Sequence, residues 1–144
     1  MIRFKSFHGT SLENGKSIIQ ENHFRPSDTD SLRMGVGACF FCQAGDDDAY
    51  PIRCARELEK YHVRQKKHPN QYAILSCMIE CEDEEYLDLF NPESLEYFHQ
   101  MRYILLNKSL AVDPDYKYRN ATVADTQVFD TIRKLRSISV IRCP

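Results

Sequence analysis

The chain has 144 residues, a formal net charge of −2, and a hydrophobic fraction of 42%. This length fits one domain, which we take to span residues 1–144, and the apolar fraction is enough for one core. The small net charge excludes a general attraction to nucleic acid or to a membrane surface, and no apolar run reaches the roughly 18 residues of a membrane-spanning helix. The first residues lack the apolar segment of a secretory signal, so we expect a cytoplasmic globular protein.

The first half of the chain predicts two strands and two helices. Alternating apolar and polar residues favour a strand at 2–7, and Ser11 suits the N-cap of a helix at 12–21. An uninterrupted apolar run predicts a buried strand at 38–42. A helix is predicted at 49–67, where apolar residues recur at helical spacing. Its core-facing residues are expected to be Ala49, Ile52, Ala55, Leu58 and Tyr61.

The second half predicts strands at 71–81, 126–129 and 137–142, with a short extended piece at 86–90. A helix is predicted at 91–107, because an Asn-Pro pair suits its first turn. Since strands and helices do not alternate regularly along the chain, we expect an α+β fold with mostly antiparallel strands.

The cysteines allow two interpretations. Because no export signal accompanies the six of them, we expect reduced, buried thiols. The alternative is a zinc site built from Cys39, Cys42, Cys77 and Cys81. On a strand, Cys77 and Cys81 lie about 13 Å apart, which is too far for one tetrahedral ion. We therefore expect no metal.

Two short motifs place chemically useful groups next to predicted strands. A His-Gly-Thr motif occupies residues 8–10, and a Gly-x-Gly motif at 35–37 precedes Cys39 and Phe40. A glycine lets the backbone approach a ligand closely, and the flanking His and Thr offer hydrogen-bonding groups. On its own, His8 is more simply explained as a hydrogen-bonded or solvated residue beside a strand.

Together these motifs resemble the ADP-ribosyltransferases of the diphtheria-toxin and poly(ADP-ribose) polymerase type. In that family a strand ends in His-Gly-Ser/Thr, a helix with an Ile and then a Phe follow, and a second strand carries Gly-x-Gly-x-Tyr-Phe. The matching pieces are Phe7 to Thr10, Ile18 and Ile19, Phe24 to Ser27, and Gly35 to Phe40. The resemblance covers the first third of the chain. It implies an ADP-ribosyltransferase-like split β-sheet with flanking helices.

The resemblance also implies a site for NAD, which is the substrate of that family. His8 is expected to bind a ribose hydroxyl of NAD. Gly9 is expected to hold the nicotinamide amide through its backbone, with Thr10 beside it.

The glycine-rich motif adds the remaining residues of the expected NAD site. Gly37 and Phe40 are expected to line it. Cys39 stands where the family usually has a tyrosine, and it neither stacks nor donates as well. Tyr50 falls where the family commonly has the tyrosine that stacks on the nicotinamide ring. The alternative is that Tyr50 packs on the core, as aromatic residues often do.

Gln127 is expected to occupy the position of the family's catalytic glutamate, on the predicted strand 126–129. Its neutral amide can orient a ribose hydroxyl, but it supplies no negative charge to a cation-like transition state. Asp125 lies two residues away on the same face of a strand, where it would supply some charge. An alignment shifted by two residues would put Asp125 in the key position.

Two functions remain open from the sequence. The first is a toxin-like mono-ADP-ribosyltransferase that transfers ADP-ribose from NAD to a protein or nucleic-acid acceptor. The second is a module of the same fold that binds NAD, a nucleotide, or a nucleic-acid or ADP-ribosylated partner without turnover. The acidic stretch 46–48 and the basic stretch 64–68 are expected to be solvated.

Overall fold

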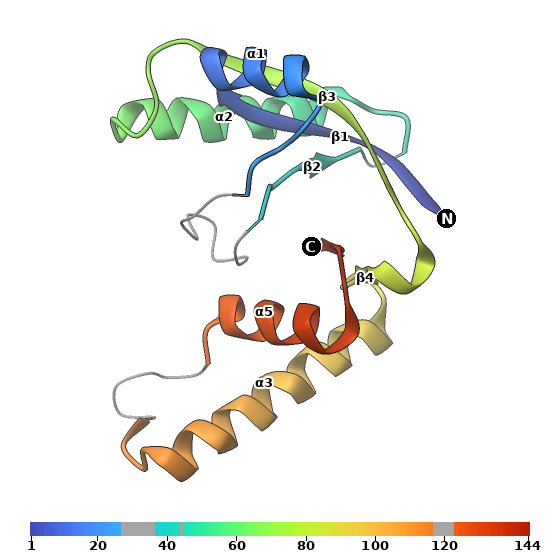
Figure 1. The fold of residues 1–144 in the computed structure, drawn as a ribbon, viewed down its shortest axis with the longest axis vertical. Helices are drawn as coiled ribbons and strands as arrows, with labels where there is room; N and C mark the ends of the chain where they lie inside the picture. The colour runs from blue at the N-terminus through green and yellow to red at the C-terminus, as the bar shows by residue number, and fades with distance from the viewer. Residues whose placement is uncertain (27–36, 44, 117–122) are drawn as a thin grey trace. The chain divides into compact units, whose positions relative to one another are not determined.

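The computed structural model describes residues 1–26, 37–43, 45–116 and 123–144. The protein is α+β, as expected, and it is divided into two compact units (Figure 1). The first unit comprises residues 1–26 and 38–80, and the described part of the second comprises residue 37 and residues 81–116 and 123–144.

The first unit contains a three-stranded sheet flanked by two helices. Its elements are β1 (Ile2–Ser11), α1 (Leu12–Glu21), β2 (Phe41–Cys42), α2 (Ala49–Arg64) and β3 (Tyr72–Cys81). The strand order is β2-β1-β3, so β1 is the central strand. It continues beyond the predicted range 2–7, so the His-Gly-Thr motif lies within the strand and not after its end.

Both neighbours of β1 run antiparallel to it. Ser6 lies opposite Cys42 of β2. On the other side, the Ser6 hydroxyl donates to the Cys77 carbonyl at 3.5 Å, whereas the Leu12 amide donates to the Gln71 carbonyl at 3.1 Å. Ser6 thus meets Cys77 within β3, whereas Leu12, directly after β1, meets Gln71, directly before β3. The two strands therefore run in opposite directions.

The two helices of the first unit cover opposite faces of β1. Helix α1 begins where Ser11 Oγ accepts a hydrogen bond from the Asn14 amide at 3.2 Å, as its cap residue predicted. A Cβ built on Gly15 of this helix would lie 3.5 Å from Cγ2 of Thr10. Gly9, the preceding residue of β1, instead faces α2, because successive residues of a strand point to opposite faces.

Helix α2 lies so close to β1 that a side chain at position 9 would collide with it. A Cβ built on Gly9 would be 2.7 Å from Cγ of Glu59 and 2.9 Å from the carbonyl oxygen of Ala55. Glu59 and His62 are consequently buried, whereas Tyr61 is 45% exposed. Of the five apolar residues expected on the core-facing side of this helix, only Ala55 is buried, Ile52 and Leu58 are partly buried, and the prediction was wrong for Ala49 and Tyr61, which are exposed.

The second unit packs two helices around a short pair of strands. Its elements are a 3-10 helix (Asp83–Glu85), β4 (Tyr86–Asp88), α3 (Pro92–Val112), α5 (Asp125–Arg136) and β5 (Val140–Arg142). Strands β4 and β5 are parallel, with Tyr86 opposite Val140. Its buried core is made of Leu87, Leu89, Phe98, Met101, Val123, Val128, Phe129, Ile132 and Ile138.

The strand predicted at 126–129 does not form, because these residues belong to α5. Val128, Phe129 and Ile132 are apolar at helical spacing, and all three are buried in the core of the second unit. Basic residues in the last turn complement the helix dipole. Burial of this apolar face therefore favours a helix over the short strand predicted at 126–129.

The six cysteines are not joined by disulfide bonds. Burial raises the pKa of the Cys77 and Cys81 thiols. Cys81 is buried, as expected, whereas the other five cysteines are only half-buried, so the expectation of buried thiols is confirmed for Cys81 alone. In the part of the chain that the structure describes, no helix has both the length and the apolar character needed to cross a bilayer.

Replacing Gly9 by alanine tests the close contact between β1 and α2. The Gly9→Ala variant should be less stable by about 1–3 kcal/mol, because the backbone carbonyl of Ala55 cannot move aside as a side chain can. Gly37→Ala is the matched control, since a Cβ there meets nothing within 4 Å. It should change the free energy of unfolding by less than about 1 kcal/mol in a urea titration. Equal effects of the two substitutions would contradict the packing described.

Candidate functional site

The imidazole of His8 links the two motifs that the sequence singled out. Its Nδ1 lies 2.7 Å from the carbonyl oxygen of Cys39. A carbonyl oxygen only accepts hydrogen bonds, so Nδ1 carries the proton of this bond. In the neutral ring, Nε2 then has a lone pair that can accept a hydrogen bond from a ligand. The same bond also fits the simpler explanation of His8 as a hydrogen-bonded strand residue.

The surroundings of His8 favour its neutral form. Burial lowers the pKa of the imidazole, and the nearby His68 lowers it further. The Cys39 carbonyl and the charge of Glu59 oppose this shift without cancelling it. His8 is therefore neutral at physiological pH, with Nε2 as an acceptor.

Two phenylalanine rings hold the imidazole in place. The Phe24 ring meets it edge-on with centroids 5.1 Å apart, and the Phe40 ring is tilted against it at 5.3 Å. The two phenyl rings also contact each other, at 5.0 Å. We call His8, Phe24 and Phe40 the aromatic triad. Of the expected NAD-site residues, the structure thus brings together His8, Cys39 and Phe40.

The other residues of the two motifs have a structural explanation. Gly9 is required by the approach of α2, and Thr10 is buried, with its methyl group facing Gly15 of α1. Gly37, by contrast, has open space where a Cβ would lie. Gly35 lies outside the described residues.

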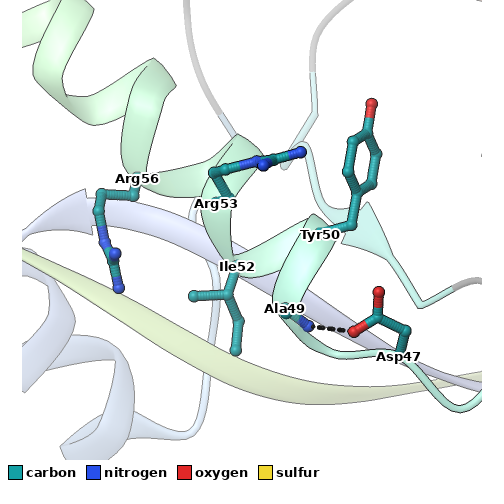
Figure 2. A pocket seen from close by; sticks show the side chains of 6 residues that line it. All are labelled: Asp47, Ala49, Tyr50, Ile52, Arg53 and Arg56. Atoms are coloured by element: carbon teal, nitrogen blue, oxygen red, sulfur yellow. Dashed lines mark hydrogen bonds between the residues drawn. The ribbon is translucent and has the colours of Figure 1, made fainter.

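Tyr50 lines a shallow pocket at the start of α2 (Figure 2). Its side chain is 59% exposed, so the alternative that it fills the core was wrong. The Arg53 guanidinium lies 5.3 Å from the centre of its ring, in a cation–π contact. The pocket has a volume of about 450 Å³ and is lined by Asp47, Ala49, Tyr50, Ile52, Arg53 and Arg56. Figure 2 shows the Tyr50 ring and the Arg53 side chain near each other, and the His-Gly-Thr motif is not part of the lining of the pocket.

Gln127 lies in the first turn of α5, in the second unit, and its side chain is exposed. The expectation that it sits on a strand was wrong. Asp125, the alternative to it, forms an ion pair with Arg102 of α3. That contact anchors the start of α5 to α3.

A second cluster of polar side chains, formed by Glu59, His62 and His68, was not predicted from the sequence. The Glu59 carboxylate is 1% exposed; one oxygen lies 3.4 Å from Nδ1 of His62 and the other 2.6 Å from Nδ1 of His68. We call these three residues the Glu-His cluster. The Glu-x-x-His spacing places Glu59 and His62 on one face of a helix, and a pattern of apolar residues does not contain this signal.

A turn after α2 brings His68 back to the helix. The amides of Lys67 and His68 both donate to the His62 carbonyl, at 2.9 and 3.4 Å. Lys66 adopts a φ of 56°, in the left-handed region that ends many helices. The imidazoles of His62 and His68 consequently meet edge-on, with centroids 4.6 Å apart.

Comparisons with models of known families, with curated proteins and with solved structures find no match for this chain.

The protonation of His8 can be measured by an NMR titration of the imidazole. Its pKa should lie below the value of about 6.5 for an unperturbed histidine. Because the unfolded chain then binds the proton more tightly, the contribution of His8 to stability is lost as the pH falls from about 6.5 through the folded-state pKa. A pKa above 6.5 would mean that Glu59 and the Cys39 carbonyl outweigh burial.

Proposed function

We propose that this chain binds NAD beside His8 and acts as an ADP-ribosyltransferase-like protein. The observation that carries the proposal is the hydrogen bond from His8 Nδ1 to the Cys39 carbonyl. It joins the two motifs through residues that are 31 positions apart in the sequence. The family that the sequence resembles uses both motifs in one NAD site. Pairing of β1 with β2 and the α+β class support the finer assignment to an ADP-ribosyltransferase-like split sheet.

Each residue of this proposed site has a definite task. Nε2 of His8 accepts a hydrogen bond from a ribose hydroxyl of NAD, which the neutral ring permits. Phe24 and Phe40 offer an apolar surface beside it for the flat nicotinamide ring. The resemblance assigns the stacking on that ring to Tyr50, whose side chain is largely exposed.

The proposed reaction breaks the bond between nicotinamide and C1′ of the ribose. Nicotinamide leaves with the electron pair of that bond, and a nucleophile of a macromolecular acceptor forms the new bond to C1′ while losing its proton. The ribose carries positive charge in the transition state, so a nearby carboxylate would speed the reaction and a neutral amide would contribute less.

A second candidate is a module of this fold that binds NAD without turnover. Gln127 favours this second candidate. The resemblance puts it at the catalytic position, but its side chain is a neutral amide, and it lies on an exposed helical turn. The two candidates share the NAD site and differ only in whether the bond to nicotinamide is broken.

Labelled NAD separates the two candidates. The protein should release nicotinamide, and His8→Ala should abolish that release and weaken NAD binding about tenfold, which corresponds to about 1.4 kcal/mol for a lost hydrogen bond. His23→Ala is the matched control, because His23 is an exposed histidine of the same unit. Tyr50→Ala should also weaken binding.

Saturable binding that depends on His8, without release of nicotinamide, would establish the second candidate in place of the first. If the protein neither binds NAD nor releases nicotinamide, both candidates fail.

A further inference from the structure

We propose that Glu59, His62 and His68 bind one zinc ion. The proposal is independent of NAD, since none of the three residues was assigned to the NAD site. It rests on the donor atoms of the Glu-His cluster, on the burial of its carboxylate and on the turn that shapes it.

The donor atoms already converge. One donor atom from each residue lies within 4.8 Å of the other two. In a tetrahedral zinc site with bonds of about 2.0–2.1 Å, neighbouring donor atoms are about 3.3 Å apart. The two contacts are made by different carboxylate oxygens: Oε1 lies 3.4 Å from Nδ1 of His62, and Oε2 lies 2.6 Å from Nδ1 of His68. Ligation through both oxygens needs the second contact to open by less than about 1 Å, whereas ligation through one oxygen needs the carboxylate to rotate.

The donor set also suits zinc. Two imidazoles and one carboxylate are the protein ligands of a known class of zinc site, which leaves a fourth position for water or a substrate. Imidazole favours zinc over magnesium or calcium, which prefer oxygen ligands.

The charge of the site favours a bound cation. The Glu59 carboxylate is 1% exposed, and within the described ranges its ion-pair partners are these two histidines and no lysine or arginine. A buried negative charge is costly unless an opposite charge or hydrogen bonds compensate it. A zinc ion compensates that charge. The Nδ1 protons that face the carboxylate move to Nε2 of each ring or to water, and each Nδ1 then binds the ion through its lone pair.

The site is built by the fold and remains accessible. Close packing of α2 on Gly9 fixes the stem of Glu59, and the turn at 65–68 fixes His68 over the helix. The His68 side chain is 30% exposed, whereas that of His62 is 11% exposed, so an ion can enter from the His68 side.

The test uses the full chain, stripped of metal with a chelator and titrated with zinc chloride against a chromophoric indicator. Wild type should bind one equivalent of zinc. His68→Ala and Glu59→Gln should each weaken binding at least about 100-fold, because each removes a ligand. The matched controls are Glu57→Gln, an exposed glutamate of the same helix, and His23→Ala; both should bind like wild type.

Two further readouts keep the test decisive. Zinc should raise the Tm of wild type by several degrees and leave that of His68→Ala unchanged, since only the folded wild type has the site. His68 is partly exposed, so this variant should fold, as circular dichroism will show. Cobalt in place of zinc should give the visible bands of a tetrahedral site without a thiolate charge-transfer band.

Three results would overturn the proposal. These are no stoichiometric zinc binding by wild type, binding that His68→Ala leaves unchanged, and a thiolate band that assigns the metal to the cysteines.

Discussion

The first unit depends on how closely α2 approaches β1. Only glycine fits at position 9, because a Cβ there would lie 2.7 Å from Cγ of Glu59. This approach removes the Glu59 carboxylate from water, and a buried carboxylate without partners costs several kcal/mol, by order of magnitude. His62 and His68 supply the partners, one for each carboxylate oxygen. Close backbone packing and a paired buried charge are therefore two aspects of the same contact.

Both proposed sites derive from neighbouring residues of the central strand. His8 meets the aromatic rings and the Cys39 carbonyl, and Gly9, the next residue, admits the helix that carries Glu59. His8 is also close enough to Glu59 and His68 for their charges to act on its pKa. The Gly of the His-Gly-Thr motif thus has a packing role whether or not NAD binds beside it.

Most of the secondary structure followed from local patterns, and the errors arose where tertiary burial decides. The N-cap at Ser11 and the apolar run of β3 are local signals, and both elements formed where they were predicted. The strand expected around Gln127 became helix α5, since burial of Phe129 in the core selects the helical face. The buried face of α2 includes Glu59, and no count of apolar residues can find a charged residue that is buried by pairing.

The candidate site was partly predictable for the same reason. His8, Cys39 and Phe40 were chosen from two motifs, and the structure brings them into contact. Phe24 was part of the resemblance but was not assigned a role, because its contact with His8 is set by the path of the chain after α1. The Glu-His cluster needs the turn after α2, and a sequence does not reveal that a lysine will adopt a positive φ.

The pairing of Glu59 with His68 is the central claim, and a double-mutant cycle tests it most directly. The free energies of unfolding are measured in the presence of a chelator for wild type, Glu59→Gln, His68→Gln and the double variant. The account predicts a coupling energy of about 1–3 kcal/mol, since the two side chains share a buried hydrogen bond. Effects that add to within about 0.3 kcal/mol would show that the carboxylate and the imidazole do not interact, and would contradict the account.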